Sequence, residues 1–225
     1  MRIQKQRARS DEEKRERREA ILATALAMYE REHSFAAFTM AALAKEAGLA
    51  KGTLYLYFRT KEELFLALLE SGFDAWFDVI DARLDDGERE WTAEDAAELV
   101  VRSVRGREML ARLLSIQPAI VEHNVEFDAA FRFKHHVMLR ADVTGRRLER
   151  RLPWLRTGEG ARFLVHLHAL VIGVWQLAQP SPVIRRVMET PEMAPARVDF
   201  AEDLRFLIIT LLAGMRTAAA ERAEP

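Results

Sequence analysis

The residues best suited to binding chemistry lie between Thr39 and Lys61, where a few cations and hydroxyl groups stand among small and apolar side chains. A lysine at 51 and a phenol at 55 can donate hydrogen bonds to base edges or to phosphate oxygens. A glycine at 52 lets the backbone approach a partner closely. The candidate nucleic-acid contacts are Thr39, Lys51, Gly52, Thr53, Tyr55, Tyr57 and Lys61.

Two short helices must position these side chains. Thr39 is a good N-cap for the first helix, and Gly48 can take the left-handed conformation that ends it. The second helix is predicted from Ala50 to Phe58, with Leu54 and Phe58 four residues apart and facing the core. Helix, short turn with glycine and helix is the helix-turn-helix layout, whose second helix enters the DNA major groove. The alternative is an ordinary helical hairpin with solvated charges.

A third helix begins at Thr60, with Glu63 at the position of a capping box. Lys61 lies in its first turn, where free N–H groups and a cation together suit a phosphate. Within the candidate interface we therefore assign Lys51 and Tyr55 to the base edges, although phosphate suits either. We assign Thr39, Thr53, Tyr57 and Lys61 to the DNA backbone.

This segment resembles the DNA-binding domain of the TetR family of bacterial one-component regulators. The resemblance is dense over residues 18–65 and architectural beyond them. Its matching residues are Ile21-Leu22, Ala25-Leu26, Met28-Tyr29, Thr39, Leu43-Ala44, Ala47-Gly48-Leu49, Lys51 to Tyr55, Tyr57-Phe58 and Lys61 to Leu64. Two departures are visible. Ala50 replaces the serine with which the family usually caps its recognition helix, and the Glu30–Phe35 connection lacks the usual glycine.

The resemblance implies an all-α protein with an N-terminal three-helix helix-turn-helix domain and a larger C-terminal helical domain for ligand binding and dimerisation. It also implies an apolar ligand cavity among the C-terminal helices. A guess at its lining is Phe73, Trp76, Phe77, Phe127, Phe131, His168 and Trp175. For any single one of these residues, a place in the core is the more ordinary role.

Composition and charge agree with this organisation. The 225-residue chain is 49% hydrophobic and poor in glycine and proline, which favours a helical globular protein. It has no cysteine, which excludes disulfides and thiolate chemistry, and its charged N-terminus lacks an apolar signal core, so we expect a cytoplasmic protein without a membrane segment. Residues 1–61 carry a net charge of +5 and the remainder −6, so the basic end coincides with the candidate interface.

We expect three regions: a flexible basic arm over 1–17, the helix-turn-helix domain over 18–65 and the regulatory and dimerisation domain over 66–225. In the arm, Arg2, Lys5, Arg7 and Arg9 could add phosphate or minor-groove contacts on DNA, or simply form a solvated tail. The first helix is predicted over about 11–32. Phe35 and Phe38 are expected to fill the core beneath it.

The helical pattern starting at Lys61 continues to Leu84, with Gly72 as a possible soft point. Further helices are predicted over 92–104, 106–116 and 119–150, with Pro118 separating the last two. Arginines at 140, 146, 147 and 150 would suit the negative end of the last helix dipole. Residues 179–198 are rich in proline and are predicted to form an irregular loop, and the tail from 218 is expected to fray.

Helices predicted over 159–178 and 199–219 are too apolar for a single contact face. Burial within one subunit is one explanation, and a four-helix interface between two copies is the other. The second is what the family resemblance implies. A dimer would place two recognition helices about 34–36 Å apart, matching successive major grooves of a palindrome.

Other chemistry has little support. The pairs His135-His136 and His166/His168 lack the i, i+4 spacing that puts two imidazoles on one metal, so no metal and no cofactor are expected. No nucleophile motif, phosphate loop or carboxylate pair indicates an enzyme. The sequence therefore predicts a homodimeric regulator, released from an operator in double-stranded DNA by an unknown small ligand. The alternatives are an activator or architectural dimer without an effector, and a helical enzyme or carrier with a vestigial DNA-binding unit.

Overall fold

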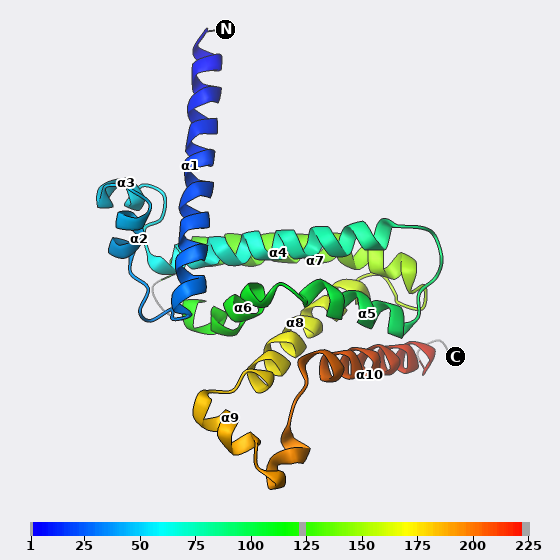
Figure 1. Cartoon of the computed structure of the whole chain (residues 1–225). Helices are drawn as coiled ribbons and strands as arrows, with labels where there is room; N and C mark the ends of the chain where they lie inside the picture. Colours follow the sequence, from blue (N-terminus) through cyan, green and yellow to red (C-terminus); the bar gives the residue numbers. More distant parts are fainter. Residues whose placement is uncertain (1, 122–124, 222–225) are drawn as a thin grey trace. The chain divides into compact units, whose positions relative to one another are not determined.

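The computed structural model describes residues 2–121 and 125–221, and this part of the chain contains helices and no strand. The all-α prediction is confirmed (Figure 1). In chain order the elements are α1 (Arg2–Glu32), α2 (Met40–Glu46), α3 (Lys51–Tyr55), α4 (Lys61–Asp85), α5 (Ala93–Val104), α6 (Glu108–Val121), α7 (Phe127–Arg151), α8 (Glu159–Ala178), α9 (Pro182–Met188), the 3-10 helix η1 (Pro191–Ala196) and α10 (Phe200–Glu221).

The chain forms two compact units. The first, here called the head unit, contains Met1–Glu70 and Ile116–Phe133, and the second, the body unit, contains Ser71–Ser115 and Lys134–Pro225. The helix α4 has 25 residues, as its pattern predicted, and contributes to both units. The head unit thus includes a segment from the middle of the sequence that the predicted 18–65 region did not contain. The predicted domain boundaries otherwise stay a prediction.

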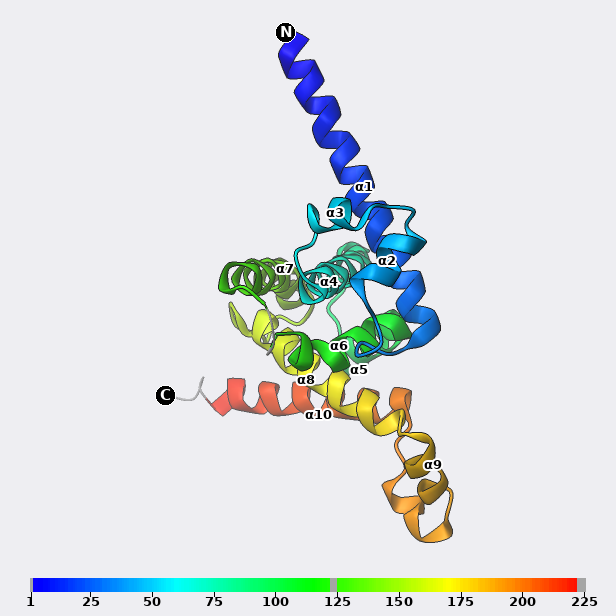
Figure 2. The same cartoon turned by 90° about the vertical axis from the view of Figure 1, so that its left-hand side faces the viewer.

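The head unit is built around Phe65, which is fully buried. Three aromatic rings pack edge-on against it: Tyr29 with a centroid separation of 5.2 Å, Phe35 at 4.8 Å and Phe38 at 5.0 Å. Such T-shaped pairs are favourable because ring edges carry positive and ring faces negative charge. The cluster joins α1, the loop after it and α4, which is the core role predicted for the two phenylalanines. Figure 2 shows α2 and α3 beside α1.

The helix α1 begins at Arg2, earlier than the predicted start near residue 11. Arginine, glutamate, glutamine and alanine are good helix formers, so a polar sequence can extend a helix without an apolar face. Within α1, Arg15 lies 3.9 Å from Glu19, one turn further on. The side chains of Arg2, Lys5, Arg7 and Arg9 lie outside the part of the chain that the structure describes, and the predicted flexibility of the arm is untested.

In the body unit, α4 and α7 lie side by side (Figure 1). Polar side chains join the two helices. Four carboxylates follow one face of α4, at 74, 78, 81 and 85. His136 Nε2 lies 2.9 Å from Asp74 Oδ1, Arg140 Nη2 donates to Asp78 Oδ1 at 2.6 Å, and Thr144 Oγ1 donates to Asp81 Oδ1 at 2.7 Å. The next turn adds Arg147 Nε, which donates to Asp85 Oδ2 at 2.9 Å.

This ladder corrects the predicted role of the α7 arginines. Arg140, Arg147 and Arg150 pair with carboxylates of α4 rather than serving mainly the helix dipole, whereas Arg146 pairs with Asp142 of its own helix. The buried Arg151 donates from Nε to the carbonyl oxygen of Leu84 at 2.6 Å and so ties down the end of α4.

The helices α7 and α8 approach each other at two glycines. A Cβ added at Gly160 would lie 2.2 Å from the carbonyl oxygen of Gly145, so the two backbones are in direct contact. Gly72 likewise allows a close approach, because a Cβ there would lie 2.9 Å from Leu110 Cδ1. We therefore interpret Gly72 as a packing residue, which differs from the predicted soft point in α4.

Two predicted boundaries were wrong. Pro118 lies inside α6 and does not end it, although proline removes one backbone donor from the helix. The next helix, α7, begins at Phe127 rather than near residue 119, and residues 122–124 lie outside the described part. The stretch 179–198 is also more regular than predicted, since it contains α9 and η1.

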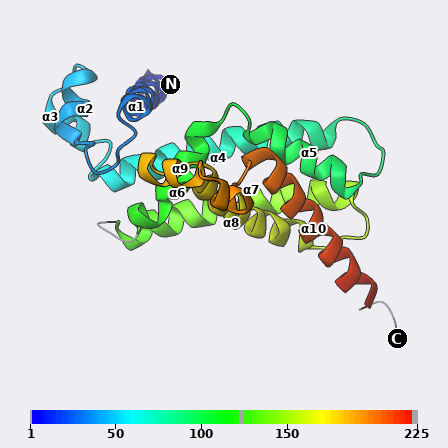
Figure 3. The ribbon, with the colours of Figure 1, turned by 60° about the horizontal axis from the view of Figure 1, so that its bottom comes forward.

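The helix α10 packs against α5 and α8 (Figure 3). Leu204, Ile208 and Leu212 bury its inner face, and Arg205 Nη1 donates to Glu98 Oε2 of α5 at 3.0 Å. Of the described helices, α8 alone has the length and apolar composition that could cross a membrane, a test that core helices of soluble proteins also pass. The tail beyond residue 221 lies outside the described part.

The end of α1 has an unusual backbone. His33 has a φ of +51°, and it is the only non-glycine residue with a positive φ in the described chain. Its N–H donates to the carbonyl oxygen of Tyr29 at 2.8 Å, which closes the last turn of α1. A side chain in this left-handed region is strained by roughly 1–2 kcal/mol, so the connection that lacks the family's usual glycine contains a strained histidine.

We expect His33→Gly to raise the free energy of unfolding by about 0.5–1 kcal/mol, because relief of the strain exceeds the entropic cost of glycine in the unfolded chain. Urea denaturation monitored by circular dichroism measures the change. His33→Ala is the matched control, since it removes the imidazole but keeps the strained Cβ. An equal gain from both substitutions would show that the backbone of this residue is not the cause.

Candidate nucleic-acid interface

The turn between α2 and α3 has the predicted geometry. Thr39 Oγ1 accepts a hydrogen bond from the N–H of Ala42 at 3.2 Å, so the predicted N-cap is confirmed. Gly48 has a φ of +65°, the left-handed conformation that ends α2. The N–H of Leu49 then donates to the carbonyl oxygen of Ala44 at 2.9 Å. The two helices are therefore held at a fixed angle by local hydrogen bonds.

The helix α3 is shorter than predicted, because it ends at Tyr55 and not at Phe58. A single turn follows, in which the N–H groups of Tyr57 and Phe58 both donate to the carbonyl oxygen of Leu54, at 3.0 and 3.1 Å. Ala50 occupies the N-cap position and provides no side-chain hydrogen bond. A five-residue helix of this kind has little stability of its own.

Two apolar anchors hold α3 in place, and the polar residues lie on its outer side. Leu54 is fully buried and Phe58 is 3% exposed, as predicted. Lys51, Gly52 and Tyr55 are exposed, whereas Thr53 and Tyr57 are half-buried. The ammonium of Lys51 lies 6.0 Å from the centre of the Tyr55 ring, so the two predicted base-edge residues are neighbours. Thr39 is exposed at the start of α2.

Lys61 is engaged within the protein. Its Nζ donates to the carbonyl oxygen of Phe35 at 2.9 Å and lies 4.2 Å from the centre of the Phe35 ring. The ammonium therefore supports the loop after α1, a role that its position in the sequence did not indicate. Thr60 caps α4 as predicted, with its Oγ1 accepting from the N–H of Glu63 at 3.1 Å. The Glu63 carboxylate accepts from the N–H of Arg59, at 2.9 Å, one residue before the predicted capping-box position.

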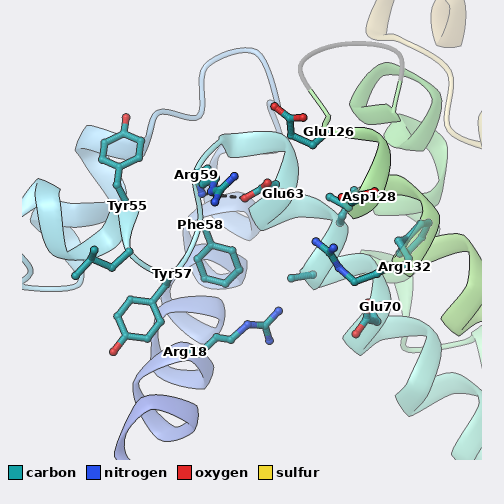
Figure 4. Close-up of a pocket in the computed structure, with 15 residues that line it drawn as sticks. Arg18, Tyr55, Tyr57, Phe58, Arg59, Glu63, Glu70, Glu126, Asp128 and Arg132 are labelled. Atoms are coloured by element: carbon teal, nitrogen blue, oxygen red, sulfur yellow. Dashed lines mark hydrogen bonds between the residues drawn. The ribbon is translucent and has the colours of Figure 1, made fainter. Parts of the chain in front are cut away.

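The structure adds residues that the sequence analysis did not select. Leu56 is 84% exposed next to Tyr55 and could contact a thymine methyl group. Beside it, a pocket of about 510 Å³ opens within the head unit (Figure 4). Its wall includes Arg18, whose guanidinium lies 5.2 Å from the centre of the Phe58 ring, and Arg59. In the sequence, Leu56 could have been found as an apolar residue at a position of the helical pattern that faces solvent.

The residues guessed to line a ligand cavity divide into two groups. Phe73, Trp76, Phe77 and Trp175 are buried, and Trp76 Nε1 donates to Ser103 Oγ at 2.8 Å. His168 stacks on Phe73 at 5.8 Å, and burial, with a smaller effect from the nearby charge of Lys134, lowers the pKa of this imidazole.

The second group departs from the expectation. Phe127 is 78% and Phe131 58% exposed, and their rings stack on each other at 6.1 Å. The side chains that line an apolar cavity are buried, so the exposure of Phe127 and Phe131 does not fit a place in such a wall. A ligand contact by any of the seven residues stays a prediction. Among the described residues, no cluster of three or more histidines and carboxylates is placed to hold a metal ion.

Gly52 has no packing reason to be glycine. A Cβ at this position would meet no heavy atom within 4 Å, and the residue lies in a helix, where glycine costs roughly 0.5–1 kcal/mol relative to alanine. The fold would therefore gain from a side chain here. The physical reason that remains for a glycine at this position is that a binding partner, such as DNA, approaches the backbone closely.

We expect Gly52→Ala to raise the melting temperature slightly and to lower the affinity for DNA at least about tenfold, because the new methyl group holds the helix away from the groove. Differential scanning fluorimetry and fluorescence anisotropy with a selected DNA fragment measure the two effects. Unchanged DNA affinity in a stabilised variant would remove Gly52 from the interface.

Comparison with protein families covers nearly the whole chain. The family described as bacterial regulatory proteins, tetR family, matches residues 21–68, and the tetracyclin repressor-like C-terminal domain matches residues 70–219. The first match contains the α2–turn–α3 segment, and the second contains α5 to η1 and all but the last two residues of α10. A search of curated proteins gave no significant match.

Solved structures share the fold. A TetR transcriptional regulator from Rhodococcus sp. RHA1 is 24% identical, with a TM-score of 0.57 over 88% of this chain and 96% of that one. SmeT, the repressor of the Stenotrophomonas maltophilia multidrug efflux pump SmeDEF, is 23% identical, with a TM-score of 0.50 over 85% and 86%. The fatty acid degradation regulator FadR from Bacillus halodurans is 15% identical, with a TM-score of 0.51 over 85% and 97%.

Members of this family are non-enzymatic DNA-binding proteins that regulate transcription, which agrees with the helix-turn-helix geometry of α2 and α3. The match to the C-terminal domain alone spans well over half of the sequence. The chain is a TetR-family transcriptional regulator.

Proposed function

We propose that the protein is a homodimeric transcriptional repressor that binds a palindromic operator and leaves it when a small, mostly apolar ligand binds. The observation that carries this proposal is the outer side of α3. Lys51 and Tyr55 are exposed together beside a glycine that the fold does not require. The basic head, with a net charge of +5 over residues 1–61, favours polyphosphate. Such a regulator acts in the cytoplasm, where the DNA is.

Within this interface, Lys51 and Tyr55 read base edges, and Thr39, Thr53 and Tyr57 contact phosphates. Gly52 permits the close approach. The Lys61 ammonium donates a hydrogen bond to the Phe35 carbonyl oxygen, so its main role is to hold the loop after α1. Its contact with phosphate is at the edge of the interface. Leu56 extends the base-reading surface.

Dimerisation supplies the second helix-turn-helix domain that a palindromic operator requires. The helices α8 and α10 bury one side within the body unit and leave large apolar side chains on the other, with Val165 48%, Leu177 66% and Phe206 66% exposed. Exposed apolar surface of this extent on neighbouring helices favours a protein interface. A two-fold axis then pairs two recognition helices with two half-sites.

Release follows from α4, which contributes residues to both units. A ligand that binds best when α4 is displaced would move the recognition helices out of register with the operator. The ligand can shift this equilibrium only by its differential affinity, and a change from 1:99 to 99:1 needs about 5.5 kcal/mol. SmeT is named as a repressor, which favours repression over the alternative of an activator or an architectural dimer without an effector.

The DNA contact is tested with fragments that the purified protein selects from its source genome. We expect Lys51→Met to weaken binding by about 1–3 kcal/mol and to relax selectivity at one base position, because a base-edge donor is lost. Anisotropy titrations at several salt concentrations distinguish a base contact from a phosphate contact. Loss of a phosphate contact would reduce the slope of log affinity against log salt concentration by about 0.9.

Lys134→Met is the matched control, since Lys134 is an exposed lysine of α7 in the body unit. It should leave both the affinity and the salt slope unchanged. Equal effects of the two substitutions, or the failure of the wild-type protein to select any fragment, would contradict the proposal.

The ligand response is tested by reciprocity. From a library of apolar compounds, one that stabilises the free protein against heat is titrated with and without the selected DNA. Linkage requires that the compound weakens DNA binding by the same factor by which DNA weakens compound binding. Calorimetry measures both factors. Independent binding of compound and DNA would rule out ligand-driven release and favour the alternative without an effector.

A further inference from the structure

The segment between α8 and α10 folds without joining the core. Residues 181–197, here called the α9 knob, contain α9 and η1, and every residue in this range is at least partly exposed. Figures 1 and 2 show α9 projecting from the other helices of the body unit. Its large apolar side chains are exposed to an unusual degree, at 71% for Val183, 45% for Ile184, 44% for Val187 and 37% for Met193.

The knob nevertheless has a defined shape. Ser181 Oγ caps α9 by accepting from the N–H of Ile184 at 3.4 Å. At the other end, the guanidinium of Arg197 donates to the carbonyl oxygens of Met188 at 2.6 Å, Glu189 at 3.0 Å and Thr190 at 3.2 Å. These bonds satisfy carbonyl groups that the end of a helix leaves free. The α9 knob is therefore an ordered element held by its own hydrogen bonds, and not an irregular loop.

The apolar side chains of α9 lie on one face. Val183 and Val187 are one turn apart, and Ile184 is next to the first of them. A helix of seven residues is marginal in water without packing. The exposed apolar face therefore needs a partner that the same subunit does not provide.

A groove that fits this face lies at the other end of α10. It has a volume of about 400 Å³ and is lined by Glu159, Arg162 and His166 of α8 and by Thr210, Leu211, Gly214, Met215 and Ala218 of α10. Its α10 side is apolar apart from Thr210, and Gly214 adds no side chain to the floor. The α10 wall of the groove thus matches the apolar face of the knob, whereas the α8 wall is polar and charged.

A subunit cannot fill its own groove with its own knob. The knob precedes α10 at Phe200, whereas Met215 lies fifteen residues further along the same helix, about 22 Å away at 1.5 Å per residue. A second copy of the chain, related by a two-fold axis that sets the α10 helices antiparallel, brings its knob to this end. Each knob then meets the groove of the other copy, as a closed two-fold interface requires.

We propose that the α9 knob of one subunit docks into the α8–α10 groove of a second copy, with Val183, Ile184 and Val187 against Leu211 and Met215. Arg186, exposed beside this face, then approaches the Glu159 carboxylate at the rim of the groove. The inference rests on the proposed homodimer and specifies which surfaces clasp it. It also explains why a proline-rich connection carries an ordered apolar helix.

The test uses the absence of cysteine from the chain. A Val187→Cys, Met215→Cys double variant is treated with a short bis-maleimide, and the products are separated on a denaturing gel. We expect a covalent dimer from the double variant and none from either single variant, because each bond joins a knob to the groove of the other copy. Light scattering before the treatment gives the oligomeric state of each variant.

The matched control is Val79→Cys with Met215→Cys, since Val79 is a valine of α4 with a similar exposure of 39%. It should give no covalent dimer. A protein that is dimeric by light scattering but whose knob and groove cysteines do not cross-link would overturn the docking and leave the homodimer intact. A monomeric wild-type protein would overturn both.

A second variant measures the contribution of the knob. Ile184→Glu places a charge on its apolar face and should raise the dimer dissociation constant about tenfold or more, because a charged group resists burial in an apolar groove. Sedimentation equilibrium measures the constant, and circular dichroism shows that the subunit remains folded. Unchanged dimer affinity would contradict docking through this face.

Discussion

The position of the candidate DNA-contacting residues depends on the packing of α3, a helix too short to be stable by itself. With five residues, α3 gains little from its own hydrogen bonds, so its orientation is set by Leu54 and Phe58, which the head unit buries. The aromatic cluster around Phe65 holds α1, its following loop and α4 together behind these anchors. Because these two anchors are buried, the outer face of α3 is not needed for packing, and it includes Gly52, which destabilises the helix.

The body unit uses a different kind of contact. Its α4 and α7 are matched through four carboxylates on one helix and imidazole, hydroxyl and guanidinium groups on the other. The pairs repeat about once per turn, and Arg140 and Arg147 each lie near carboxylates of two successive turns of α4, so opposite charges face each other along much of both helices. The backbone contact between Gly145 and Gly160 then ties α7 to α8. A displacement of α4 within this unit is therefore resisted by these polar partners as well as by the packing of its buried apolar side chains, such as Phe73, Trp76 and Phe77.

The C-terminal helices α8 and α10 leave large apolar side chains exposed within one subunit. On α10, Leu204, Ile208 and Leu212 are buried while Phe206 is 66% exposed, so only one of its two faces is buried within the subunit. The α9 knob extends the same excess of apolar surface beyond the helices. The proposed two-fold assembly would cover both, since the surface left exposed by one copy would be offered to the other.

The sequence by itself determined the parts that depend on neighbouring residues. The Thr39 cap, the left-handed Gly48, the long α4 and the apolar α8 and α10 follow from local propensity and helical period. Sequence also located the exposed side of α3, because Leu54 and Phe58 define the side that is buried.

Only the tertiary structure decided contacts between distant positions. Asp74 and His136 are 62 residues apart, and Lys61 bonds to a carbonyl 26 residues away, so no local pattern identifies either pair. The helix through Pro118 likewise survives a local breaker. Local rules fail at these places because the free energy of packing against distant segments exceeds the local preferences of the chain.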